Sequence, residues 1–208
     1  MTHRPAIVWW MSSAFCSALA LAIVVLVVAG ADAHGTVTAL RVTARFSFLL
    51  FWLAYTGRAL ATLFGQHFEA VARRGREFGL AFASAHLVHV LLLVWLYRIS
   101  TRPPVSEETF VFFGIGLVWT YLLALFSIKR LAQAIGPAWR VLRFIGLEYI
   151  TLAFFADFVF NPLLAGTFEK GPKAVLQYLP FSILTIIGPV LRLAALPRSP
   201  RFAKRATP

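Results

Sequence analysis

The sequence predicts an all-α integral membrane protein, folded as a single bundle of six transmembrane helices. Of the 208 residues, 60% are hydrophobic and only 13% are charged, whereas soluble domains carry about 45–50% apolar and about 25% charged residues. The mean hydropathy is +0.78. Apolar stretches fill nearly the whole chain, so we expect one transmembrane domain over residues 1–208. This composition excludes a disordered tail and an ordinary cytosolic enzyme, and the single cysteine excludes a disulfide scaffold.

Each apolar stretch is long enough for the roughly 20 residues that cross a bilayer. The first, 6–31, follows a basic residue and ends in Ala-Asp-Ala, which resembles a signal-peptide cleavage site. Its apolar run exceeds the roughly 7–15 residues of the apolar region within a signal peptide, so we expect a retained helix. Short polar connections such as Arg102-Pro103-Pro104 separate the stretches that follow. The apolar stretches between these connections predict helices over 44–63, 78–97, 109–128, 142–164 and 176–196. A basic cytoplasmic tail is expected at 197–208.

The basic residues predict the orientation. Alternate connections carry fourteen Lys and Arg on one side and six on the other. Because cytoplasmic loops are enriched in Lys and Arg, we expect a multi-pass protein of a bacterial-type inner (cytoplasmic) membrane, with both termini cytoplasmic. We therefore expect the net charge of +12 to set the orientation, and the basic tail to lie against anionic lipid headgroups. Since no aromatic platform is interleaved with these charges, we expect no nucleic-acid partner.

Four ionisable residues fall inside the predicted spans, where charge is expensive and indicates function. His86 and His89 project from one helix face, a turn apart. His89 and Asp157 are expected at similar depth in the outer half of the bilayer, close enough to pair. Glu148 is expected to pair with an arginine for a structural role, the candidates being Arg143, Arg58 and Arg192.

Three interpretations of the histidines stay open. The rings could be neutral and hydrogen-bonded between helices. His86, His89 and an acid could bind a metal ion, although two histidines three residues apart are a weak signal. One histidine could ligate haem.

The last interpretation comes from a resemblance. Arg73-Arg74-Gly75-Arg76-Glu77-Phe78-Gly79-Leu80, followed by His89 ten residues after Gly79, resembles the ferric-reductase-like transmembrane family. More narrowly, it is similar to the six-helix haem-binding membrane subunits of bacterial methionine-sulfoxide reductase systems. Ile135-Gly136-Pro137-Ala138-Trp139-Arg140 and Tyr178-Leu179-Pro180 also match in order and spacing. In that family a histidine at the position of His89 ligates haem.

The chain departs from the family on the fifth predicted helix. Family members have a histidine four residues after the tryptophan and another about thirteen residues further on, where this chain has Arg143 and Ala156. The resemblance therefore implies at most one b-type haem, with iron on His89, His86 as its neighbour, and the opposite side open or filled by an unexpected group such as Tyr149 or Cys16. Arg41, Arg45 and Arg98 suit the haem propionates, with Asp157 as further support.

Three functions remain open. The first is electron transfer as the membrane component of an oxidoreductase, with a flavin or quinone supplied only by a partner. Because no nucleotide-binding motif is present, that role needs a separate redox partner or subunit. The second is a haem-free membrane scaffold or partner subunit of the same fold. The third is a metal-binding or transport protein that uses His86, His89, Asp157 and Glu148.

Overall fold

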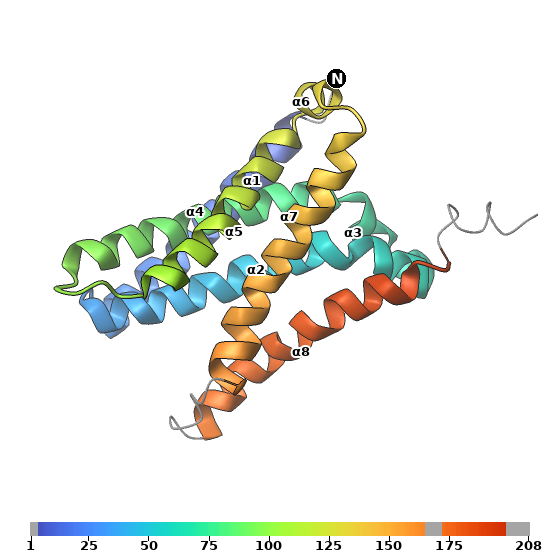
Figure 1. The fold of residues 1–208 in the computed structure, drawn as a ribbon. Helices are drawn as coiled ribbons and strands as arrows, with labels where there is room; N and C mark the ends of the chain where they lie inside the picture. The colour runs from blue at the N-terminus through green and yellow to red at the C-terminus, as the bar shows by residue number, and fades with distance from the viewer. Residues whose placement is uncertain (1–3, 165–171, 199–208) are drawn as a thin grey trace, which may run out of the picture. The chain divides into compact units, whose positions relative to one another are not determined.

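The computed structural model describes residues 4–164 and 172–198, and helices account for almost all of them. The α-helices are α1 (Arg4–Ala29), α2 (Ala33–Phe64), α3 (Glu69–Arg73), α4 (Gly75–Ile99), α5 (Glu107–Phe126), α6 (Lys129–Ala134), α7 (Ala138–Phe155) and α8 (Pro172–Ala195). A 3₁₀ turn, η1 (Gly65–Phe68), precedes α3, and a π-helix, η2 (Ala156–Leu164), follows α7 (Figure 1). The predicted all-α membrane fold is confirmed.

Five of these helices, α1, α2, α4, α5 and α8, are long and apolar enough to cross a bilayer. The chain is therefore a multi-pass membrane protein. The tail predicted at 197–208 lies outside the described residues from Ser199 onward.

The second predicted helix was placed too late in the chain. It begins at Ala33, because the connection from α1 needs only residues 30–32. Gly30 takes a left-handed φ of +94°, which ends α1, and the Asp32 carboxylate accepts a hydrogen bond from the Gly35 amide at 2.8 Å. An acidic side chain that caps free amides stabilises a helix start. Arg41 and Arg45 consequently lie on α2 and not in a connection.

The fifth predicted span, 142–164, is not one continuous α-helix. The structure divides it between α7 and η2. Within its 18 residues α7 carries three charged side chains, Arg140, Arg143 and Glu148, and α7 is not among the five helices that are long and apolar enough to cross a membrane. Six membrane spans therefore remain a prediction.

A proline accompanies the change from α-helix to π-helix. Pro162 has no amide proton, so it cannot donate to the carbonyl of Phe158 four residues earlier. The hydroxyl of Ser182 on α8 donates to that carbonyl at 2.6 Å instead. The ring of Phe158 also stacks on Phe181 of α8, with ring centroids 5.4 Å apart. These contacts fasten η2 to α8.

The helices form two compact units, each described here by itself. The first unit contains residues 1–51 and 77–146, and the second contains 52–76 and 147–208. In the first unit, α1, the start of α2 and α4 pack through small buried side chains, so their backbones approach closely. These are Ala14, Ala18, Ala22, Ala39, Ala81 and Ala85. The hydroxyl of Ser84 on α4 donates to the Met11 carbonyl of α1 at 2.9 Å.

In the second unit, the later part of α2 packs against α8. The indole Nε1–H of Trp52 donates to the carbonyl of Leu184 at 2.8 Å. A Cβ added at Gly188 would lie 3.4 Å from both the Trp52 Nε1 and the Tyr55 ring. A Cβ at these distances would make ordinary van der Waals contact, so the packing of α2 against α8 does not require a glycine at this position.

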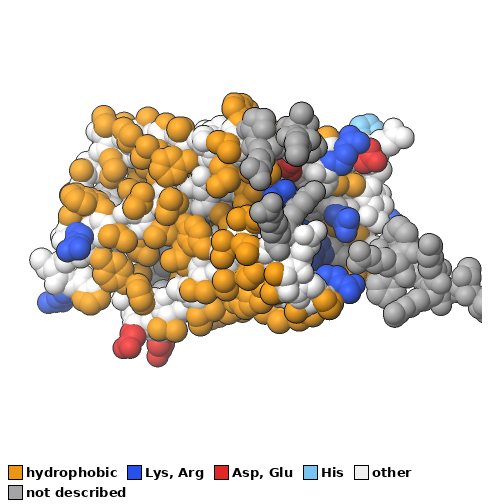
Figure 2. Space-filling model, turned by 90° about the horizontal axis from the view of Figure 1, so that it is seen from above, with side chains coloured by type: hydrophobic (Ala, Val, Ile, Leu, Met, Phe, Trp, Pro, Cys, Tyr) orange, Lys and Arg blue, Asp and Glu red, His pale blue; other side chains and the backbone are white. Residues whose placement is uncertain are grey.

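Large apolar side chains are exposed along the outside of the helices. Val28 is 81% exposed, Val27 78% and Leu176 72%, and Figure 2 shows apolar side chains over most of the described surface on one face. Soluble proteins rarely expose apolar patches of this extent. A lipid bilayer is the environment that accommodates them.

The orientation can be tested with reporter fusions. Because the predicted cytoplasmic side holds fourteen of the twenty basic residues, we expect C-terminal fusions to be active only with a reporter that requires the cytoplasm. Parallel fusions to an export-dependent reporter provide the control. Activity of the exported reporter alone would reverse the assignment of every connection.

Candidate functional site

Among the described residues, two clusters of polar side chains lie on the long helices, one in each unit. In the first unit, the imidazole rings of His86 and His89 stack on α4. Their centroids are 5.1 Å apart and their planes differ by 13°. The ring of Phe82, one turn earlier, lies 5.4 Å from that of His86. Both histidines thus project from one face of α4, as the sequence predicts.

His89 is tied to α2 through Thr43. The Nδ1 atom of His89 lies 3.2 Å from the Thr43 hydroxyl oxygen, and Thr43 is completely buried. In contrast, the Nδ1 atom of His86 is buried with no hydrogen-bond partner among the described residues. Buried polar atoms in native proteins nearly always have a partner. The Oγ atom of Ser47 and the Oε2 atom of Glu77 share this state, so it does not by itself single out His86 as a ligand.

The two histidines of the first unit offer at most one axial ligand to a haem iron. Their rings lie side by side on one face of α4 with centroids 5.1 Å apart, so His86 and His89 cannot approach one iron from opposite sides. Among the described residues, no group of three or more His, Cys, Asp and Glu is placed to hold a metal ion. Cys16, a suggested second ligand, is an exposed thiol on α1.

The expected supporting residues lie in different places. Arg41 is exposed on α2, Arg45 is partly buried on the same helix, and Arg98 is exposed in the last turn of α4. Asp157 is the second residue of η2 and belongs to the second unit, as does Tyr149 of α7. The pairing of His89 with Asp157 and the role of the arginines toward propionates stay predictions.

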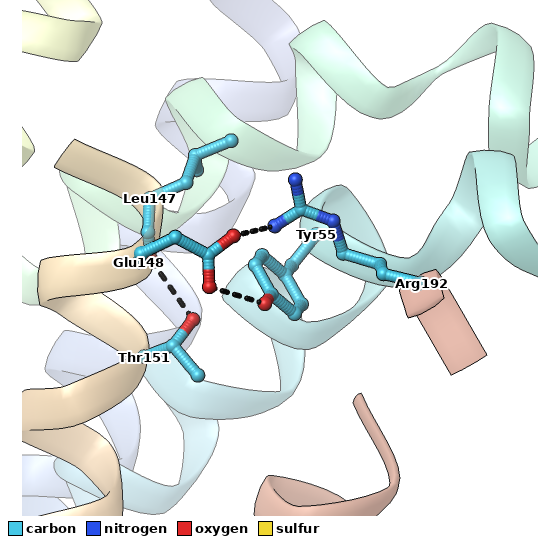
Figure 3. Close-up of polar contacts among 5 residues, drawn as sticks. All are labelled: Tyr55, Leu147, Glu148, Thr151 and Arg192. Carbon is cyan, nitrogen blue, oxygen red and sulfur yellow. Dashed lines mark hydrogen bonds and ion pairs between the residues drawn. The ribbon is translucent and has the colours of Figure 1, made fainter. Parts of the chain in front are cut away.

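The second cluster is an ion pair with a tyrosine (Figure 3). The Arg192 guanidinium of α8 donates to Oε1 of Glu148 on α7 at 2.5 Å. The Tyr55 hydroxyl of α2 donates to the other carboxylate oxygen, Oε2, at 2.9 Å. The Arg192 guanidinium carbon also lies 4.1 Å from the centre of the Tyr55 ring, in the arrangement of a cation–π contact.

Three helices of the second unit therefore meet at the Glu148 carboxylate. Of the three arginines considered from the sequence, Arg192 is the one that the structure places against Glu148, as the structural interpretation expects. The hydroxyl of Thr151, one turn along α7, donates to the Leu147 carbonyl at 2.8 Å. The Arg192 guanidinium neutralises the Glu148 carboxylate. Together with the Tyr55 hydrogen bond, this ion pair connects α2, α7 and α8.

Two members of these sites were not identified from the sequence. Thr43 is separated from His89 by 46 residues, and a wrongly placed start of α2 put Thr43 outside any helix. Tyr55 carried a usable signal, because a tyrosine hydroxyl inside a span needs a hydrogen-bond partner.

Comparisons with protein-family models, with curated proteins and with solved structures found no match to this chain.

Proposed function

We propose that this protein is a membrane electron-transfer component that carries at most one b-type haem, with His89 as its axial ligand and a separate protein as redox partner. The observation that carries the proposal is the His86–His89 stack on α4. Two imidazoles on a helix that is long and apolar enough to cross a membrane are costly unless they have a role. The ferric-reductase-like spacing of Gly79 and His89 supports the assignment.

The polar contact of the pair with Thr43 is on Nδ1 of His89, so Nε2 of that ring is the nitrogen that we assign to the ligand. A bound haem supplies one-electron chemistry at its iron. The chain itself would hold the iron through His89, exclude water with apolar neighbours such as Val88 and Leu92, and leave electron supply to a flavin- or quinone-bearing partner.

A haem-free scaffold or partner subunit is the second candidate. The contact between Thr43 and His89 favours it, because that contact joins α2 to α4 without any cofactor. Metal binding or transport by His86, His89, Asp157 and Glu148 has less support, since Arg192 and Tyr55 already occupy both oxygens of the Glu148 carboxylate.

Difference spectroscopy separates the first two functions. Purified protein from cells supplied with a haem precursor is reduced with dithionite and reoxidised with ferricyanide. Electron transfer predicts a reversible change in the haem absorption bands. The scaffold function predicts no change, and that result would reject the proposal.

A further inference from the structure

We propose that Thr43 is a positioning residue that holds the proton of His89 on Nδ1 and so leaves Nε2 as the nitrogen with a free lone pair. The proposal rests on the proposed function in one respect: a haem iron is taken as the ligand that Nε2 binds. The protonation of the ring can be measured without haem.

The first step is the hydrogen bonding of the Thr43 hydroxyl. This group has one proton and two acceptor lone pairs. Its oxygen lies 2.9 Å from the Ala39 carbonyl and 3.1 Å from the Leu40 carbonyl, in donating geometry to both. A proton directed at these carbonyls leaves only the lone pairs of the hydroxyl for His89. The nitrogen 3.2 Å away, Nδ1 of His89, must then be the donor.

The second step excludes the reverse arrangement, in which Thr43 donates to an unprotonated Nδ1. In that arrangement the single proton of the Thr43 hydroxyl would point away from the Ala39 and Leu40 carbonyls, which lie 2.9 Å and 3.1 Å from its oxygen in accepting positions. With the proton directed at these carbonyls, the ring nitrogen that faces the hydroxyl oxygen is the donor.

The third step is the consequence for the opposite ring nitrogen. A neutral imidazole has one proton, so a proton on Nδ1 leaves Nε2 with its lone pair. Histidines that bind metals almost always donate their other ring N–H to a protein acceptor, which fixes the orientation and basicity of the ring. The Thr43 hydroxyl oxygen supplies that acceptor from α2, and Nε2 of His89 is left as the ligand nitrogen.

Nitrogen-15 NMR of the histidine rings tests this assignment in the full-length protein without haem. The His89 signals are identified by their loss in His89→Gln. We expect a protonated Nδ1 and an unprotonated Nε2 in the native protein. Thr43→Val removes the hydroxyl and keeps the side-chain shape, so part of the population should move its proton to Nε2. Thr43→Ser restores the hydroxyl and should restore the native spectrum.

Thr36→Val is the matched control. Thr36 lies on the same helix, is also completely buried and donates to a carbonyl four residues earlier, that of Asp32, at 2.7 Å. We expect this variant to leave the His89 signals unchanged. A proton on Nε2 in the native protein, or His89 signals identical in Thr43→Val and native protein, would overturn the proposal.

Haem titration adds a second readout. Loss of an acceptor behind a ligating histidine typically weakens metal affinity about 10- to 100-fold, so Thr43→Val should bind haem more weakly by that factor and Thr36→Val should not. Equal affinities in the two variants would contradict the positioning role. A native protein that binds no haem but has the stated ring protonation would reject the electron-transfer function and leave the Thr43 assignment supported.

Discussion

Replacing Arg192 by alanine is expected to destabilise the protein by about 2–3 kcal/mol, because the substitution leaves the Glu148 carboxylate without its counter-ion. Removal of one partner from a buried ion pair typically costs about 3–5 kcal/mol. The Arg192 and Glu148 side chains are 28% and 37% exposed, so this pair is only partly buried. We therefore expect a loss of stability between the cost for a buried pair and the roughly 0–1 kcal/mol of an exposed pair. Thermal unfolding in detergent or lipid nanodiscs measures the effect as a lowered Tm.

Arg198→Ala is the control for this experiment. Arg198 is an exposed cation just beyond the end of α8, so its loss should leave Tm nearly unchanged. Tyr55→Phe removes one neutral donor from the same carboxylate and should cost about 1 kcal/mol. If Arg192→Ala and Arg198→Ala unfold at the same temperature, the ion pair does not join α7 to α8 as described.

Replacing His89 by alanine is expected to abolish haem binding, since His89 is the proposed axial ligand. His86→Ala should retain haem and shift its spectrum or reduction potential only modestly, because the neighbouring ring stacks on His89 but does not face the iron from the opposite side. Haem content is measured by absorption after purification from cells supplied with a haem precursor.

The two histidine variants control for each other. They remove the same side chain from the same helix face, so a nonspecific loss of stability should affect both. Equal haem content in His89→Ala and native protein would end the ligand assignment. Under the scaffold function, neither variant changes haem content, and both only lower Tm.

The sequence predicted the membrane fold well because the signal is compositional. Runs of about 20 apolar residues identify spans regardless of how helices pack. Helix ends were less predictable, since α2 starts after a turn of three residues that depends on the left-handed φ of Gly30 and on the Asp32 cap. The π-helix at 156–164 could not be read from periodicity, because it also depends on Ser182 of a distant helix.

The residues of the candidate sites could be predicted from the sequence, but the residues that they contact could not. The three-residue spacing of His86 and His89 sets their shared face on any α-helix. The partner of His89 depends on the register between α2 and α4, which no local pattern specifies. Glu148 was expected to need a cation because a charge within the membrane is expensive, but the choice of Arg192 came from the packing of α8 against α7.

The number of haem groups per chain is the most direct measurement of the proposed function. We predict a value close to one for the native protein purified from cells supplied with a haem precursor, because His89 provides a single axial ligand from the first unit. A value of zero in every preparation would contradict electron transfer and favour the haem-free scaffold function.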